Sequence, residues 1–129
     1  MQGKGPAEAF RLLESKLPGL RGRRFYGAIH VLEGRPEEYY ACVERDPGDD
    51  PTAMAVEEGV LPGGLYVRRK LTGWKAIVDA GQLPSIGREM AQLYSLDPTR
   101  PELEFYRSME ELHLLLPVTD RKRRPTPSA

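Results

Sequence analysis

The sequence is poor in the side chains that build disulfide scaffolds and metal centres. Cys42 is the only cysteine among the 129 residues, and the only histidines are His30 and His113. A single cysteine cannot form an internal disulfide, and these three side chains do not make a usual structural zinc site, which takes four ligands. The scarcity rules out a disulfide scaffold and nearly rules out a zinc finger, and we expect no metal and no cofactor.

Net charge and long apolar runs are missing as well. The chain has 19 lysines and arginines against 19 aspartates and glutamates, whereas a domain that binds nucleic acid normally has an excess of basic residues. No apolar run approaches the roughly 18–20 residues that a membrane helix needs, and the opening MQGKGPAEAF has no apolar signal core. We therefore expect a cytoplasmic protein that contacts no membrane and does not have nucleic acid as its partner.

The remaining composition is that of one globular domain. Apolar residues make up 40% and charged residues 29% of the chain, a balance that can form a core within a single domain of this length. The last ten residues, DRKRRPTPSA, combine four consecutive cations with two prolines and cannot bury apolar surface. We expect one domain over 1–119 and a disordered basic tail over 120–129.

Apolar spacing in the first half of the chain predicts a helix followed by two strands. Phe10, Leu13 and Leu17 recur at helical spacing within 7–17. Side-chain polarity alternates over 24–32 and again over 38–45, with the turn-forming EGRPE between them.

The second half repeats this order after a strand of its own. A strand is predicted over 64–72, following a Pro-Gly-Gly kink. Residues 74–95 have helical spacing, and Gly81 and Pro84 predict a break within them. Two further strands are predicted over 102–108 and 111–118.

These elements predict an α+β fold built as a duplicated strand–helix–strand–strand unit, with an antiparallel sheet and two helices on one face. If the halves match, the first strand is short or truncated, because only Met1–Gly5 precedes the first helix. A strand so short leaves backbone groups unpaired at a sheet edge, which favours a homodimer that pairs there. Internal symmetry of this kind often leaves a cleft between the halves, where small ligands bind.

Several short motifs resemble the GyrI-like small-molecule-binding domain in their order and spacing. They are KGPAEAF (4–10), FYGAIH (25–30), YYACV (39–43), PGGLY (62–66), EFY (104–106) and LLLPV (114–118). The resemblance implies a stand-alone form of the effector-binding domain of AraC- and MerR-type regulators, which binds lipophilic, often cationic molecules between its halves. The acidic pocket residue of that family matches Glu104. The chain departs from the family in its short first strand, and it contains no helix-turn-helix segment.

Glu104 also stands out without the resemblance. In the strand ELEFYRS, Glu102, Glu104 and Tyr106 share one face. If that face lines a cleft, the carboxylate is poorly compensated, and an organic cation supplies the missing charge. The alternative is a solvated carboxylate paired with an arginine or lysine of the next strand.

Aromatic side chains could complete a binding wall around such a cation. We predict that the ligand-binding residues are Tyr26, Tyr66, Trp74, Glu104 and Tyr106. Three other tyrosines, Tyr39, Tyr40 and Tyr94, are interpreted as structural. The basic run Arg68, Arg69 and Lys70 is interpreted as a solvated strand face.

Catalytic motifs are absent: there is no Ser–His–acid spacing, no close Cys–His pair and no glycine-rich phosphate loop. Binding without turnover is therefore the leading hypothesis. Two alternatives follow from the resemblance. One is a hydrolase that detoxifies strained cyclopropane compounds, with Glu104 and Tyr106 as the catalytic pair. The other is a protein-interaction module that acts on DNA gyrase, which the RKRR tail could serve.

Overall fold

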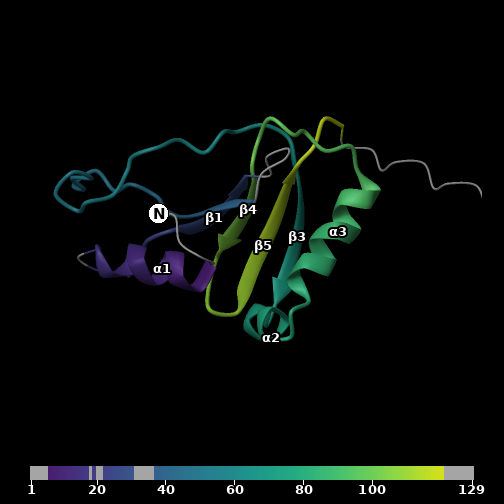
Figure 1. The fold of residues 1–129 in the computed structure, drawn as a ribbon, viewed down its shortest axis with the longest axis horizontal. Helices are drawn as coiled ribbons and strands as arrows, with labels where there is room; N and C mark the ends of the chain where they lie inside the picture. The colour runs from purple at the N-terminus through teal and green to yellow at the C-terminus, as the bar shows by residue number, and fades with distance from the viewer. Residues whose placement is uncertain (1–5, 18, 20–21, 31–36, 121–129) are drawn as a thin grey trace, which may run out of the picture.

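The computed structural model describes residues 6–17, 19, 22–30 and 37–120. Within these ranges the chain forms helices and strands in the order shown in Figure 1. Their bounds are α1 Pro6–Ser15, β1 Phe25–His30, β2 Glu38–Val43, β3 Tyr66–Thr72, α2 Trp74–Asp79, α3 Leu83–Leu93, β4 Glu102–Tyr106 and β5 Glu111–Pro117. The expected first strand, Met1–Gly5, and the tail over 121–129 lie outside the described residues.

The five strands form one sheet in the order β2-β1-β4-β5-β3, and all neighbouring strands are antiparallel. The hairpins β1-β2 and β4-β5 lie side by side because β1 pairs with β4 in the middle of the sheet. An α+β fold with an antiparallel sheet is thus confirmed. Each hairpin follows a helix, and that helix packs on the second strand of its hairpin: α1 on β2, and α3 on β5.

One row of residues crosses the sheet and defines its helix-covered face. Gly27 of β1 pairs with Ala41 of β2 on one side and with Glu104 of β4 on the other. Glu104 in turn pairs with Leu114 of β5. Directly paired residues in an antiparallel sheet point to the same face, so all four residues of the row share one face.

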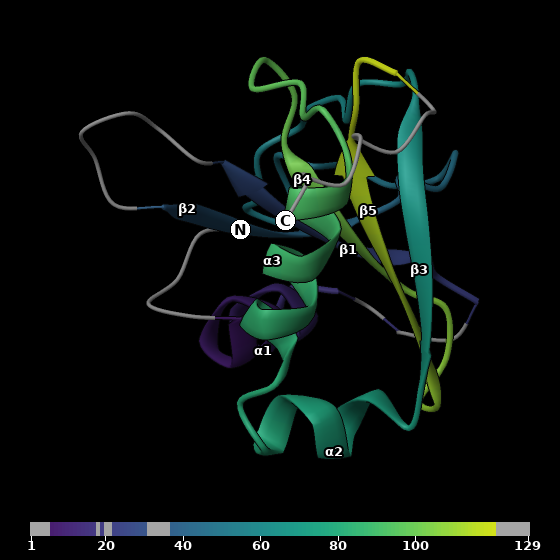
Figure 2. The ribbon, with the colours of Figure 1, turned by 90° about the vertical axis from the view of Figure 1, so that its right-hand side faces the viewer.

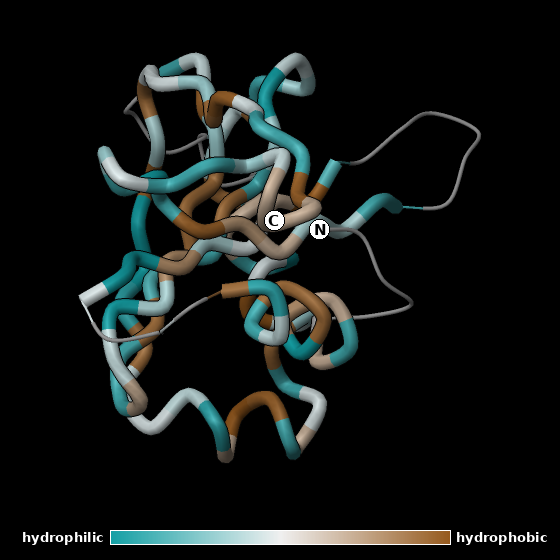
Figure 3. Tube along the Cα trace, turned by 90° about the vertical axis from the view of Figure 1, so that its left-hand side faces the viewer, coloured by the Kyte–Doolittle hydropathy of each residue, from teal (hydrophilic) through white to brown (hydrophobic). Residues whose placement is uncertain are grey.

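Both long helices cover this face. Ala9 of α1 packs with Ala41 in one buried group, and Met90 of α3 packs with Leu114 in another. The first group, called the α1 cluster, contains Ala9, Leu13 and Ala41 with partly buried neighbours that include Phe10, Phe25 and Tyr39. The second, called the α3 cluster, contains Leu71, Met90, Leu112, Leu114 and Leu116 with partly buried neighbours that include Trp74 and Tyr106. Figure 3, in which the trace is coloured by hydropathy, shows hydrophobic and hydrophilic residues alternating along the chain.

The break within the second helical segment is confirmed. α2 ends at Asp79, Gly81 has a φ of +68°, and α3 begins with Pro84 in its first turn. Glycine adopts positive φ without steric strain. Proline is tolerated in the first turn of a helix because backbone N–H groups there have no acceptor within the helix, so the lack of an N–H costs no hydrogen bond. The two residues therefore separate α2 from α3 and allow the chain to change direction (Figure 2).

The Pro-Gly-Gly kink before β3 is held by Arg100. Its guanidinium donates hydrogen bonds to the carbonyl oxygens of Leu65 (2.9 Å) and Val118 (3.1 Å) and forms an ion pair with Asp97. The same group lies 4.7 Å from the centre of the Tyr66 ring. Together these contacts of Arg100 fix where β3 begins beside β5.

No helix in the described part of the chain is both long and apolar enough to span a bilayer.

Candidate functional site

Glu104 is buried at the junction of the two apolar clusters. Its exposed fraction is 3%, and it lies on β4, between the hairpin covered by α1 and the strands covered by α3. Tyr39 of the α1 cluster donates a hydrogen bond to Glu104 Oε1 over 2.7 Å, and Tyr106 of the α3 cluster donates to the same atom over 3.0 Å. Among the described residues, no arginine or lysine forms an ion pair with Glu104.

Gly27 makes room for this arrangement. It lies directly beside Glu104 on the neighbouring strand. A Cβ atom at position 27 would be 2.5 Å from Glu104 Oε1, and it would be closer still to the Tyr39 hydroxyl. The hydroxyl and the carboxylate therefore meet over the one residue of the row that has no side chain.

Aromatic rings from both helical regions enclose the carboxylate. Phe10 of α1 contacts Tyr106 edge-on with ring centres 5.0 Å apart, and it contacts Tyr39 at 6.2 Å. Trp74 of α2 contacts the Tyr106 ring at 5.2 Å, and its indole N–H donates to the Ser108 carbonyl. We call Phe10, Tyr39, Trp74, Glu104 and Tyr106 the Glu104 cluster.

The charge of Glu104 is poorly compensated. Burial raises the pKa of its carboxyl above the ordinary value, and the hydrogen bonds from Tyr39 and Tyr106 oppose this rise. Burial, followed by the effect of the Glu104 carboxylate, raises the pKa of both tyrosine hydroxyls, which therefore remain protonated donors. Two neutral donors stabilise a carboxylate less than a cation does at the same distance.

A second carboxylate lies on the same face of β4. Burial raises the pKa of Glu102, and the carboxylates of Glu37 and Glu104 add to the rise. The solvated ion pair considered as an alternative for Glu104 is not present, because its paired neighbours are Gly27 and Leu114. One face of β4 therefore carries two carboxyl groups, and burial raises the pKa of both.

Three of the predicted site residues are brought together and two are not. Glu104, Tyr106 and Trp74 belong to the Glu104 cluster, as described above. Tyr26 and Tyr66 lie on the opposite face of the sheet, because both are an odd number of residues from the row of Glu104. Tyr26 pairs with Phe105, one residue from that row, and Tyr66 pairs with Pro117, three residues from it. This corrects the expectation of one shared wall. The Tyr26 ring stacks on Phe105 instead, and the Tyr66 hydroxyl donates to the Pro62 carbonyl.

Tyr39, Phe10 and Gly27 are the members of the site that the sequence analysis missed. Tyr39 is interpreted as structural in the sequence analysis because a tyrosine at strand spacing is more often half-buried packing with a solvated hydroxyl. The alternation within its strand does not show that β4 lies beyond β1. Gly27, in contrast, could have been recognised from the sequence alone. A glycine inside a strand marks a place where another group approaches the backbone closely.

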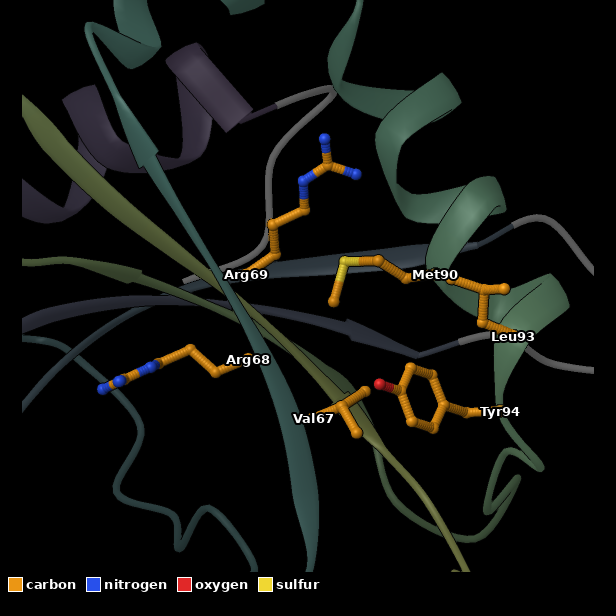
Figure 4. A pocket seen from close by; sticks show the side chains of 6 residues that line it. All are labelled: Val67, Arg68, Arg69, Met90, Leu93 and Tyr94. Atoms are coloured by element: carbon orange, nitrogen blue, oxygen red, sulfur yellow. The ribbon is translucent and has the colours of Figure 1, made fainter. Parts of the chain in front are cut away.

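Glu104 lines neither of two surface cavities in the described part of the chain. One, of about 280 Å³, lies between β3 and α3 (Figure 4). The other, of about 180 Å³, is lined by Ile29, Leu96, Asp97, Pro98, Arg100, Glu102 and Pro117. The aromatic rings thus close over Glu104 in this conformation.

Other reactive side chains lie outside the cluster. His113 contacts the Glu111 carboxylate through Nε2 at 2.7 Å, on the face that carries Phe105. Burial raises the pKa of the Cys42 thiol, which lowers its reactivity at neutral pH. Within the described ranges, no three His, Cys, Asp or Glu side chains are grouped so that they could hold a metal ion.

No family model, curated protein or solved structure matches the chain. The resemblance to GyrI-like domains consequently rests on the sequence motifs and stays a prediction.

Proposed function

We propose that this domain binds a small lipophilic organic cation at the Glu104 cluster. The observation that carries the proposal is a carboxylate with an exposed fraction of 3%, enclosed by aromatic rings and without a cationic partner among the described residues. An isolated buried charge costs several kcal/mol unless it is paired. A bound cation supplies the partner that this carboxylate lacks.

The aromatic rings favour an organic cation over an inorganic ion. A cation over the face of a tyrosine or tryptophan gains about 0.5–2 kcal/mol per ring, with the larger values in desolvated sites. Phe10, Tyr39, Trp74 and Tyr106 also offer apolar surface, which a hydrated metal ion cannot use. The matching ligand therefore combines one positive charge with a hydrophobic body.

The ligand enters by separating the two clusters. α1 is held on β2 and α3 on β5, so the boundary between their clusters runs over Glu104. Phe10 crosses this boundary through its edge contact with Tyr106. A rotation of the Phe10 side chain, or a small displacement of α1, uncovers the carboxylate without disturbing the sheet.

The internal duplication predicted from the sequence is compatible with a binding site at Glu104. The two helix–hairpin units, α1-β1-β2 and α3-β4-β5, meet where β1 pairs with β4. If the units are repeats, Glu104 lies at their junction, where a cleft between repeats would open. The missing counterpart of β3 in the first unit would then fall on Met1–Gly5, outside the described residues.

Titration of a matched pair of ligands tests the proposal. Phenyltrimethylammonium and tert-butylbenzene have nearly the same shape and differ in charge, and fluorescence of Trp74, the only tryptophan, reports binding. Glu104→Gln should weaken binding of the cation by about ten- to more than a hundredfold. This loss is equivalent to roughly 1.5–3 kcal/mol, the range for a hydrogen bond to a charged group. The affinity for the neutral compound should change little.

Glu102→Gln is the matched control. It removes the same charge from the same strand, two residues away, and should change the cation affinity by threefold at most. Equal affinities of the parent and Glu104→Gln for both compounds would contradict the proposal. Equal losses of cation affinity in Glu104→Gln and Glu102→Gln would also contradict it, because they would show a general effect of negative charge and not a site at Glu104.

Hydrolysis of strained cyclopropane compounds is a second candidate on the same residues. The 3.0 Å hydrogen bond from Tyr106 to Glu104, together with the raised pKa of that carboxyl, provides an acid–base pair. Product formation that is lost in both Glu104→Gln and Tyr106→Phe would support this candidate. Saturable binding without product supports binding alone.

A further inference from the structure

We propose that β3 and α3 form a docking surface for an extended acidic segment of another protein, which adds to the sheet as a strand beside β3. This inference is independent of the Glu104 cluster. It rests on three features of one surface: the backbone edge of β3, the cavity beside it and the basic run over 68–70.

The outer edge of β3 presents backbone groups for pairing. β3 is the last strand of the described sheet and pairs with β5 along its whole length. The Gly73 N–H donates to the Glu110 carbonyl, and the Val118 N–H donates to the Leu65 carbonyl, so both ends of the register are hydrogen-bonded pairs. Hydrogen-bonded pairs alternate in an antiparallel ladder. The N–H and C=O groups of the even-numbered residues, among them Arg68 and Lys70, consequently point away from β5.

The cavity beside this edge accepts alternate side chains of an added strand. It has a volume of about 280 Å³ and is lined by Val67, Arg68, Arg69, Met90, Leu93 and Tyr94. Leu93 is 41% exposed. A strand paired with β3 would place every second side chain on the helix-covered face, against these apolar groups of α3. Figure 2 shows α3 lying alongside β3.

The charge on the opposite face of β3 selects acidic partners. Arg68 points away from Met90, Leu93 and Tyr94 in Figure 4, and it forms no ion pair with a described residue. Lys70 on the same face is already paired with Glu111 at 3.1 Å, and Arg69, on the helix-covered face, is paired with Glu89 at 3.1 Å. The matching segment therefore alternates apolar and acidic side chains, and an acidic one lies opposite Arg68.

The same charges disfavour a second copy of this chain. Two β3 strands paired with each other would bring the basic runs over 68–70 together, and like charges on directly opposite residues destabilise a sheet. Lysine and arginine on an edge strand oppose self-pairing for this reason. The occupant is accordingly a segment of opposite charge.

Fluorescence anisotropy with a labelled hexapeptide of alternating valine and glutamate tests the proposal. We expect saturable binding that Arg68→Glu weakens at least tenfold. Leu93→Glu should weaken it as strongly, because it replaces an apolar side chain of the cavity with a carboxylate that repels the acidic peptide. Arg11→Glu, on the exposed side of α1 beside the other half of the sheet, is the matched control for net charge and should leave the affinity within twofold.

Methylated peptides test the strand pairing itself. Only one edge of the peptide faces β3, so methylating one alternate set of its amides should abolish binding, while methylating the other set should preserve it. The proposal is overturned if the peptide does not bind or if both methylated forms bind equally. It is also overturned if Arg11→Glu and Arg68→Glu lose affinity equally, or if sedimentation shows a dimer through β3 without peptide binding.

Discussion

At the residue scale, the candidate site depends on a glycine as much as on the carboxylate. Gly27 leaves the space in which Tyr39 reaches Glu104 across the pairing of β1 with β4. A larger residue would keep the two groups apart, and the cluster would then lose one of its two hydroxyl donors. The identity of position 27 thus controls the charge environment of position 104.

Gly27→Ala should destabilise the fold and weaken binding at the cluster. The added methyl group lies 2.5 Å from Glu104 Oε1, so the carboxylate and the Tyr39 ring must both shift. Inserting a methyl group into a packed site typically costs about 1–3 kcal/mol. Urea unfolding measures the loss. Gly59→Ala is the control, because nothing lies within 4 Å of its Cβ, and its stability should change by less than about 0.5 kcal/mol.

At the scale of elements, the sequence predicted the helices and strands well and their neighbours poorly. Alternation within one strand shows which residues share a face, as for Glu104 and Tyr106. It does not show which strand lies beside it, and the pairing of β1 with β4 joins distant parts of the chain. For this reason Tyr39 was missed, and Tyr66 was assigned to a wall on the wrong side of the sheet.

Gly81→Ala should destabilise the connection between α2 and α3. Gly81 has a φ of +68°, and a residue with a Cβ atom in the left-handed region costs about 1–2 kcal/mol. Gly87→Ala, inside α3 where nothing lies within 4 Å of the added Cβ, should instead stabilise by about 0.5–1 kcal/mol. Thermal unfolding of both variants gives the comparison, and equal shifts would contradict the assignment of the break to Gly81.

At the scale of the whole molecule, carboxyl groups paired with arginine and the unpaired, buried carboxyl of Glu104 act on stability in opposite directions. Hydrogen bonds from Arg23 lower the pKa of Asp49 to about 2, and hydrogen bonds from Thr99 and Arg100 lower that of Asp97 to about 2. These two groups stabilise the fold above their unfolded value of 3.8 and lose that contribution as the pH falls toward 2. Glu104 has a raised pKa, so the folded state binds its proton more tightly than the unfolded state does.

The free energy of unfolding should therefore fall less steeply with rising pH in Glu104→Gln than in the parent. As the pH rises from the unfolded value of 4.5 through the folded pKa, the parent loses stability because the folded state must release the Glu104 proton. The variant lacks this proton and should be more stable than the parent at neutral pH and similar to it near pH 4. Urea unfolding across this range measures the difference. A parent that gains stability relative to the variant as the pH rises would contradict the burial of an unpaired carboxylate.

The pairing of β1 with β4 also has a consequence for the order of folding. The hairpins β1-β2 and β4-β5 are local, whereas the two strands that join them are about 80 residues apart in the chain. Contacts between distant segments carry the larger loop-closure entropy and slow the folding of a domain. We therefore expect Glu104 to lose its hydration only when these two distant strands dock, and not when the β4-β5 hairpin forms.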